Sequence, residues 1–485
     1  MKKILTIVLS SISIFINAQS GITWSASVTV ASNTYQNLHP RITLDRNGNP
    51  MIIWGDGNTQ RVYFSRWNGI MFTTPLILNT SQTIATATWM GPDIASKGDT
   101  VYVVMKETPE NMDTLHHIYI VHSYDGGISF SAPLRVENIH DSICRFPTIC
   151  CDDAGNPIVG FMKFDSAYNN SSYSVTRSND MGMTFANDVN ASGWSGGAVC
   201  DCCPAALISS GNTVAMLYRD KNNNIRDMWT GISNNGGLTF LNGFKVDNTN
   251  WNLSSCPASG PDGIIIGDTL YSTWMSGSSG ISMIYFSKSS VSNLISGPTI
   301  PLTGMLSGLS VQNYPRIASN GSSVAIAWEQ TRNGINQLGL FFTNNIYNGF
   351  PALFDTIATN NITNTDVSIG NGEIHVVWED DNAGEVRYRK GTFINSTVSP
   401  EIIAKKNCVN VYPNPSTNTI TISSGLGIMN YELGITDVLG NSVYSQPINN
   451  STQLTINISH LNNGVYFYHI RSDKETLQGR FVVGK

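Results

Sequence analysis

Charged side chains are scarce in this chain of 485 residues, because Asp, Glu, Lys and Arg together make up only 13% of it. The formal net charge is −6, so the basic surface that nucleic-acid binding requires is missing. Strong helix formers are also sparse, whereas Asn, Ser, Thr and Gly are abundant. This composition favours many short strands joined by polar turns and predicts an all-β protein without a nucleic-acid partner.

Long hydrophobic runs are absent beyond the N-terminus, so no later segment has the 18 consecutive apolar residues expected of a membrane span. The first residues differ: the basic "MKK" precedes the apolar "ILTIVLSSISIFI", and Ala18 then offers a small residue for cleavage. This is the pattern of a secretory signal peptide, which we place at residues 1–18. Its presence predicts export into an oxidising compartment.

A repeat of about 50 residues occupies most of the chain. The phrase "HPRITLDRNGNPMIIW" at 39–54 recurs six more times in weakened form. Each copy reads as two strands around a tight turn, then a third strand, a second turn and a fourth strand. Four strands per unit of this length are typical of a propeller blade, and we predict a seven-bladed β-propeller over residues 19–397. Its seven anchor positions are Pro40, Pro92, Pro147, Pro204, Pro261, Pro315 and Thr365.

The two ends of the repeat region complement each other. The segment "GITWSASVTVA", which follows the signal peptide, reads as a fourth strand without earlier partners, and the seventh copy stops after its third strand. Pairing the two would complete the last blade and remove an exposed sheet edge.

A second motif marks the turn between the third and fourth strands. It appears as "SYDGGISF" at 123–130, "SNDMGMTF" at 178–185 and "SNNGGLTF" at 233–240. The pattern resembles the Asp box of sialidases and related bacterial-neuraminidase-repeat propellers, here centred on Asp125, Asp180 and, with a substitution, Asn235. In that family these turns lie on the outer rim, so the resemblance implies a structural role for the three residues.

The last eighty residues lose the repeat register. Residues 398–407 read as a linker, and 408–485 as alternating strands of a small β-sandwich. The ordered phrases "VYPNPS", "DVLGNSVY", "GVYFYHI" and "GRFVVGK" resemble the C-terminal sorting domain of Bacteroidota cargo of the type IX secretion system. The resemblance implies contact with that secretion machinery and a secreted or cell-surface location. An ordinary immunoglobulin-like accessory domain is the alternative.

The mouth of the propeller channel is the expected functional surface, formed by loops that enter the innermost strands. Aromatic platforms beside polar groups suit sugars, whose C–H faces stack and whose hydroxyls need donors and acceptors. We therefore expect a glycan or a cell-surface protein as ligand, a monomeric chain and no cofactor. The ligand-binding candidates are Arg41, Arg145, Arg316, Trp89, Trp194 and Trp251.

A sialidase-type exo-glycosidase is the alternative function. The family resemblance implies three arginines that grip a carboxylate, a tyrosine nucleophile assisted by a glutamate, and an aspartate acid/base. Catalytic candidates are Arg41, Arg219 and Arg316, with Asp93 and Glu329. The sequence offers no convincing Tyr–Glu pair and one blade more than the six of a sialidase, and a solvated ion-pair network would equally explain the arginines.

Five of the eight cysteines precede anchors of three consecutive repeats and are expected to converge in one sector of the mouth. Disulfides are the expected outcome in an exported protein. A thiolate site for copper or zinc, or a redox site, at Cys200–Cys203 is the alternative. The spacing is not a standard zinc spacing and no histidine adjoins it, so no metal is predicted. The disulfide candidates are Cys144, Cys200, Cys202, Cys203 and Cys256.

Overall fold

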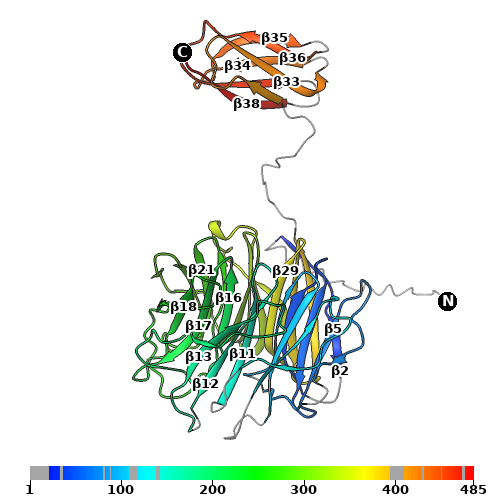
Figure 1. The fold of residues 1–485 in the computed structure, drawn as a ribbon, viewed down its shortest axis with the longest axis vertical. Coiled ribbons are helices and arrows are strands. Elements are labelled where there is room, and N and C mark those ends of the chain that lie inside the picture. The colour runs from blue at the N-terminus through cyan, green and yellow to red at the C-terminus, as the bar shows by residue number, and fades with distance from the viewer. Residues whose placement is uncertain are drawn as a thin grey trace, which may run out of the picture. The chain divides into compact units, whose positions relative to one another are not determined.

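The computed structural model divides the chain into two units, residues 1–395 and 396–485. It describes residues 21–32, 36–79, 82–87, 89–108, 117–137, 143–165, 167–393, 409–428, 431–448, 451–471 and 476–485 (Figure 1). The predicted signal peptide and linker lie outside the described residues. A single 3-10 turn, η1 (Ile346–Asn348), interrupts the strands of the described chain, which confirms the all-β class. None of the described helical residues forms a segment long and apolar enough to cross a membrane.

The described part of the first unit contains seven antiparallel sheets of four or five strands. The first three are β3 (Asn37–Leu44), β4 (Pro50–Asp56), β5 (Arg61–Arg66) and β6 (Leu76–Ile77); β7 (Asp93–Lys97), β8 (Thr100–Lys106), β9 (Ile118–Ser123) and β10 (Leu134–Arg135); and β11 (Ile143–Cys151), β12 (Pro157–Phe164), β13 (Ser172–Arg177) and β14 (Val189–Asn190).

The other four sheets follow in chain order. They are β15 (Ala198–Val199), β16 (Ala206–Ser210), β17 (Thr213–Lys221), β18 (Met228–Ser233) and β19 (Asn242–Lys245); β20 (Asp262–Ile266), β21 (Thr269–Ser276), β22 (Met283–Ser290), β23 (Ile295–Ser296) and β24 (Ile300–Pro301); β25 (Leu309–Asn320), β26 (Ser323–Arg332), β27 (Ile335–Thr343) and β28 (Asp355–Thr359); and β29 (Ile362–Gly370), β30 (Glu373–Asp380) and β31 (Glu385–Phe393) with β1 (Ile22–Trp24) and β2 (Val28–Ser32).

The sheets follow one another in a propeller-like order. The strands β3, β7, β11, β16, β20, β25 and β29 each contact the next one in this series, and β29 contacts β3. Each sheet then continues outward through hairpin-connected strands, as in β3-β4-β5-β6. The loops before these seven strands therefore meet around one axis.

The last sheet combines both ends of the unit. β1 pairs with β31 through Ile22 and Phe393, and β2 pairs with the same strand through Val28 and Tyr388. Figure 1 shows these blue strands beside the yellow ones. The Trp24 Nε1–H donates to Asp355 Oδ2 at 2.9 Å, which ties β1 to the preceding sheet as well. The pairing predicted for the N-terminal segment is confirmed.

The tight turns of the hairpins follow from short polar side chains. In the β3–β4 turn, Asp45 Oδ1 accepts hydrogen bonds from the backbone N–H groups of Asn47 and Asn49, both at 2.8 Å. Gly48 takes a φ of 82°, a conformation that costs glycine little because it has no Cβ. The turn therefore fixes the register of the two inner strands.

Apolar side chains fill the space between neighbouring sheets. Ile53 and Phe64 of one sheet, for example, form one cluster with Ile94 and Val103 of the next. The strands are buried on both faces, because each sheet is sandwiched between two others. Burial of such residues is the main stabilising contribution, at roughly 1.5–3 kcal/mol per large side chain.

The Asp-box turns also hold neighbouring sheets together. Asp125 Oδ1 accepts from the backbone N–H groups of Ile128 and Ser129 at 2.9 and 3.0 Å, and its other oxygen accepts from the Ser129 hydroxyl at 2.6 Å. The box aromatic, Phe130, packs edge-on against Phe64 of the previous sheet with ring centroids 4.9 Å apart. Asp180 and Asn235 accept the equivalent backbone bonds from Thr184 and Thr239.

We expect Asp125→Ala to destabilise the first unit by about 1–2 kcal/mol, since several turn donors lose their acceptor at once. Asp125→Asn should cost much less, because Asn235 already holds the same turn in this chain with an amide. Urea unfolding of the two variants and the wild type measures the difference. Equal loss in both variants would show that charge, rather than the acceptor, stabilises the turn.

The described residues of the second unit form two sheets that share an apolar core including Ile420, Ile435 and Phe481. One sheet has the order β32-β33-β36, and the other β35-β34-β37-β38. Their bounds are β32 (Val409–Tyr412), β33 (Thr419–Ile428), β34 (Tyr431–Thr436), β35 (Ser442–Ile448), β36 (Ser451–Asn457), β37 (Gly464–Arg471) and β38 (Thr476–Val483).

Candidate functional site

A shared backbone irregularity shapes the face where the inner strands begin. In four sheets the residue before the anchor has a positive φ: His39 at 58°, Phe146 at 48°, Tyr314 at 46° and Asn364 at 50°. At each of these places the pairing with the second strand shifts register, as in a β-bulge. Such strained residues persist only where the surrounding structure holds them, and they gather at functional sites.

These bulges surround a central pocket on the axis. It is lined by residues next to the anchors, among them the predicted Arg41, Arg316, Asp93 and Trp89. Its cavity volume is only about 60 Å³. That volume accommodates a few water molecules and no sugar ring. A ligand at this face would therefore lie across the mouth, where Trp89 is 39% exposed.

The two arginines of the pocket differ in their partners. Arg316 Nε lies 3.0 Å from Asp366 Oδ1 and 3.4 Å from Asp262 Oδ2, so two carboxylates share it. Arg41 instead donates to the Pro40 carbonyl at 2.8 Å and lies 2.6 Å from His39 Nε2. Among the described residues no carboxylate pairs with Arg41. Burial first, and then the charge of Arg316, lower the pKa of Arg41 to about 10.

Three aspartates at the pocket join neighbouring sheets: Asp93 lines it, whereas Asp262 and Asp366 each follow a lining residue. Asp366 Oδ2 accepts from the backbone N–H of Ile42 at 3.0 Å, across the junction of the last sheet with β3. Asp93 accepts from Ile149 at 3.1 Å, and Asp262 from Ile317 at 2.9 Å, at two further junctions. Each carboxylate thus stabilises a neighbouring strand, and burial raises the pKa of Asp262.

Two glutamates lie where second strands return to the same face. Glu379 Oε2 accepts from the backbone N–H of His39 and from Asn364 Nδ2, both at 3.1 Å. Burial, followed by a hydrogen bond with Asp381, raises the pKa of Glu379 to about 8. Burial likewise raises the pKa of Glu329 to about 8. Burial and the charge of Glu329 raise the pKa of Tyr314 to about 12, so Tyr314 and Glu329 are electrostatic neighbours.

Because the folded-state pKa of Glu379 is raised, the folded protein retains a proton that the unfolded chain loses above about pH 4.5. Stability should therefore fall as pH rises from about 4.5 to 8. Glu379→Gln keeps an acceptor oxygen without the charge, so it should be more stable than the wild type at pH 8.5, by on the order of 3 kcal/mol, and nearly equal at pH 4.5. Denaturant unfolding across this pH range measures the effect, and parallel profiles would contradict it.

The structure places the other predicted residues away from the pocket lining. Arg145 lies over the Phe146 ring at 4.7 Å and donates to the Asp201 carbonyl at 3.3 Å. Arg219 is buried and donates to the carbonyls of Ser259, Arg226 and Met275, so it is not placed beside Arg41 and Arg316 as one carboxylate clamp.

Two of the three tryptophans also pack within the sheets. Trp194 lies against Gly231 and Gly243, and a Cβ at either position would meet its indole ring. Trp251 is buried, and the guanidinium of Arg219 lies 5.2 Å from the centre of its ring. Glu329, although close to Tyr314, does not line the pocket.

Sequence reasoning missed His39, Tyr314 and Asn364 as pocket-lining residues. Each occupies the position immediately before an anchor, and its backbone bulge turns it toward the axis. The steps His39–Pro40 and Tyr314–Pro315 were the available signal, and Asn364 lacked even this, because Thr365 follows it. A positive φ at these positions is not evident from a strand pattern.

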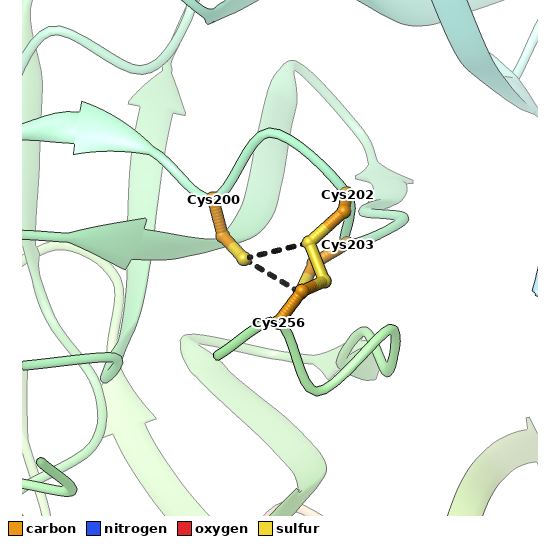
Figure 2. Close-up of side chains that lie close together, drawn as sticks. All are labelled: Cys200, Cys202, Cys203 and Cys256. Carbon is orange, nitrogen blue, oxygen red and sulfur yellow. Dashed lines mark hydrogen bonds between the residues drawn. A yellow bond between two sulfur atoms is a disulfide. The ribbon is translucent and has the colours of Figure 1, made fainter. Parts of the chain in front are cut away.

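Four of the five predicted cysteines converge. Cys202, after β15, and Cys256, in the loop before β20, form a disulfide that links two neighbouring sheets, with Cα atoms 6.4 Å apart. Figure 2 shows Cys200 and Cys203 beside it. Cys144 does not join them, contrary to expectation, because it is a free cysteine in the core cluster of β8, β9 and β12.

The sulfur atoms of Cys200, Cys202, Cys203 and Cys256 all lie within 4.8 Å of one another. In the described chain, they are the one group of three or more potential ligands close enough to hold a metal ion. Thiolates suit soft metals such as Cu(I) and Zn²⁺. Two of these four sulfurs are joined in a disulfide, however, so this oxidation state does not provide four thiolates.

Comparison with known proteins gives a family match for the second unit alone. Residues 410–484 match the Secretion system C-terminal sorting domain family. No curated protein matches the chain significantly.

Several solved structures resemble the chain at low identity. An ulvan lyase, a polysaccharide lyase bound to a GlcA(1-4)Rha3S saccharide, has a TM-score of 0.50 and 10% identity over 75% of this chain and 95% of that one. A Dyadobacter fermentans protein of unknown function has a TM-score of 0.47 and 12% identity over 77% and 100%. A Trypanosoma rangeli sialidase mutant with trans-sialidase activity has a TM-score of 0.44 and 11% identity over 96% and 89%.

The likeness to the ulvan lyase concerns the fold alone, because the identity is only 10%. The sorting domain is more specific: it indicates delivery through the type IX secretion system, and contact with that machinery, to the cell surface or the exterior. The chain is therefore an exported all-β protein with a propeller-like unit and a C-terminal domain of the secretion-sorting family.

Proposed function

We propose that this protein is a secreted seven-bladed propeller that binds a glycan, or an acidic segment of a protein, across the mouth of its channel. The seven sheets and the cyclic contacts of their inner strands support seven blades over residues 19–397. A signal peptide at 1–18, a linker at 398–407 and a sorting domain at 408–485 complete the proposed organisation.

One observation carries the binding proposal: Arg41 lines the pocket without a carboxylate partner among the described residues, next to exposed Trp89. The charges of Asp366, Asp93 and Asp262 act on Arg41, but none of these carboxylates forms an ion pair with it. A buried cation without a directly paired carboxylate favours an anionic group from outside. An indole ring beside it offers a stacking surface for a sugar. Asp93, which lines the pocket, and Asp262 and Asp366, which each follow a lining residue, already accept hydrogen bonds from backbone N–H groups. This arrangement supports recognition of an acidic sugar lying over the mouth.

We expect Arg41→Gln to weaken binding of a uronic-acid polysaccharide at least about tenfold, the effect of losing one charge-assisted contact. Isothermal titration calorimetry with acidic and neutral polysaccharides measures it. The matched control is Arg46→Gln, because Arg46 follows the opposite end of β3 and pairs there with Asp99. Unchanged affinity in Arg41→Gln, or equal loss in both variants, would refute the proposal.

Glycoside hydrolysis is the second candidate. Tyr314 lies in electrostatic reach of Glu329, a carboxyl whose raised pKa suits a general acid at neutral pH. The small pocket counts against it, since an exo-acting enzyme must enclose a terminal sugar. Release of a fluorogenic aglycone from a sialoside, abolished by Arg316→Ala, would establish this activity and reject binding alone.

A further inference from the structure

The disulfide between Cys202 and Cys256 has a third sulfur beside it. Cys200 Sγ lies 3.6 Å from Cys202 Sγ and 2.8 Å from Cys203 Sγ (Figure 2). Thiol–disulfide exchange requires this kind of approach, because a thiolate attacks one sulfur of a disulfide and displaces the other. The cluster therefore holds an attacking group, a disulfide and a second thiol within reach of one another.

We propose that these four cysteines form a disulfide-exchange centre, in which one disulfide moves between Cys202–Cys256, which links two sheets, and Cys200–Cys203, which lies within one loop.

The surroundings of Cys200 favour its thiolate. Arg226 Nη1 donates to Cys200 Sγ at 2.9 Å, and Arg226 is itself buried. The hydrogen bond from Cys203, together with the charges of Arg219 and Arg226, outweighs burial and lowers the pKa of Cys200 to about 6. Tyr173 also faces the cluster, where its hydroxyl donates to the Cys203 carbonyl at 2.7 Å.

The exchange needs no outside oxidant. The Cys200 thiolate attacks Cys202 Sγ, so the Cys200–Cys202 bond forms, the Cys202–Cys256 bond breaks, and Cys256 leaves as a thiolate that takes a proton from water. Cys203, after losing its proton, then attacks Cys200 Sγ and releases Cys202 as a thiolate, which is protonated in turn. One disulfide and two thiols are present before and after.

The two cysteine pairs differ in their exposure to solvent. Cys200 and Cys203 are buried, Cys202 is partly buried and Cys256 is exposed. The exchanged form thus frees the exposed Cys256 in the loop before β20 and the partly buried Cys202 in the segment after β15. In the form with the Cys202–Cys256 disulfide, Arg226 Nε donates to the Leu253 carbonyl at 3.0 Å and Arg219 Nε to the Ser259 carbonyl at 3.1 Å. Neither hydrogen bond involves the disulfide, so we expect both to hold the loop that carries Cys256 near its partner after exchange. The reverse reaction remains possible for the same reason.

The full chain, purified without reductant, tests the proposal. Excess N-ethylmaleimide is added to the native protein at several pH values, and peptide mapping identifies each alkylated and each bonded cysteine. We expect Cys256 to be alkylated to completion while a disulfide appears at Cys200–Cys203. The capture rate should fall about tenfold per pH unit below pH 6, with the thiolate fraction of Cys200.

Two variants test whether Cys200 is the attacking thiol. Cys200→Ser should stop alkylation of Cys256 and leave the Cys202–Cys256 disulfide intact. Cys151→Ser, a free cysteine on β11 outside the cluster, should leave the capture rate unchanged. The peptide map of the wild-type protein tests the proposal even if Cys200→Ser fails to fold. Two permanent disulfides, a stoichiometric metal held by four thiols, or a Cys256 that is never alkylated would each overturn the proposal, and none of these outcomes bears on ligand binding at Arg41.

Discussion

Asp366→Ala is expected to destabilise the propeller-like unit by about 3–5 kcal/mol, the cost of removing one partner from a buried ion pair. Asp366 accepts from Arg316 through one oxygen and from the Ile42 backbone N–H through the other. Its loss leaves that N–H without its acceptor at the junction between the last sheet and β3. Asp262, 3.4 Å from Arg316, compensates only in part.

Asp366→Asn is the matched control, because its single amide oxygen keeps the acceptor for Ile42, while the charge and the acceptor for Arg316 are lost. Its loss of stability should be roughly half that of the alanine variant. Chemical denaturation followed by tryptophan fluorescence gives both values. A difference from wild type below about 0.5 kcal/mol in Asp366→Ala, the range of ordinary surface substitutions, would rule out a stabilising role at the junction.

A chain that begins at residue 33 should lose on the order of 5 kcal/mol or more, and should aggregate, compared with one that begins at residue 21. The missing residues include Ile22 and Val30, which are buried, and Trp24, which packs against the adjoining cluster. Their absence also leaves β31 as an unpaired edge, and such edges recruit other chains.

Size-exclusion chromatography and thermal unfolding of the two chains provide the measurement. A synthetic peptide of residues 21–32 added in excess should partly restore the shorter chain, since β1 and β2 reach β31 by pairing and do not depend on chain connection for their contacts. A monomeric shorter chain with an unchanged melting temperature would show that ring closure contributes nothing to stability.

The repeated strands could be predicted from the sequence because each pair of strands depends on residues close together in the chain. Alternating apolar residues around a turn such as Asp45–Asn49 specify two paired strands without reference to distant residues. The Asp-box turns are equally local, since Asp125 bonds residues three and four positions ahead. Even the pairing of β1 with β31 followed from counting strands, because an incomplete sheet at one end needs a strand from the other.

Which residues line the central pocket was decided by the tertiary structure. Arg41 and Arg219 look equivalent as arginines near strand ends, yet one lines the pocket and the other is bound by three backbone carbonyls. Two of the three carbonyls that bind Arg219 belong to Ser259 and Met275, which lie 40 and 56 positions away, and no local pattern encodes such contacts. The bulges that turn His39 and Tyr314 toward the axis likewise depend on register shifts against the second strand.

The cysteines show the same division. Their spacing in the repeat predicted that loops of adjacent sheets would bring sulfur atoms together, and for four of them this holds. The sequence alone determined the strands, their turns, the closing partner and the sorting domain, because each depends on short-range periodicity or motif. Tertiary structure decided which charges face the pocket and which sulfurs meet, because side-chain direction and burial depend on how separate sheets pack.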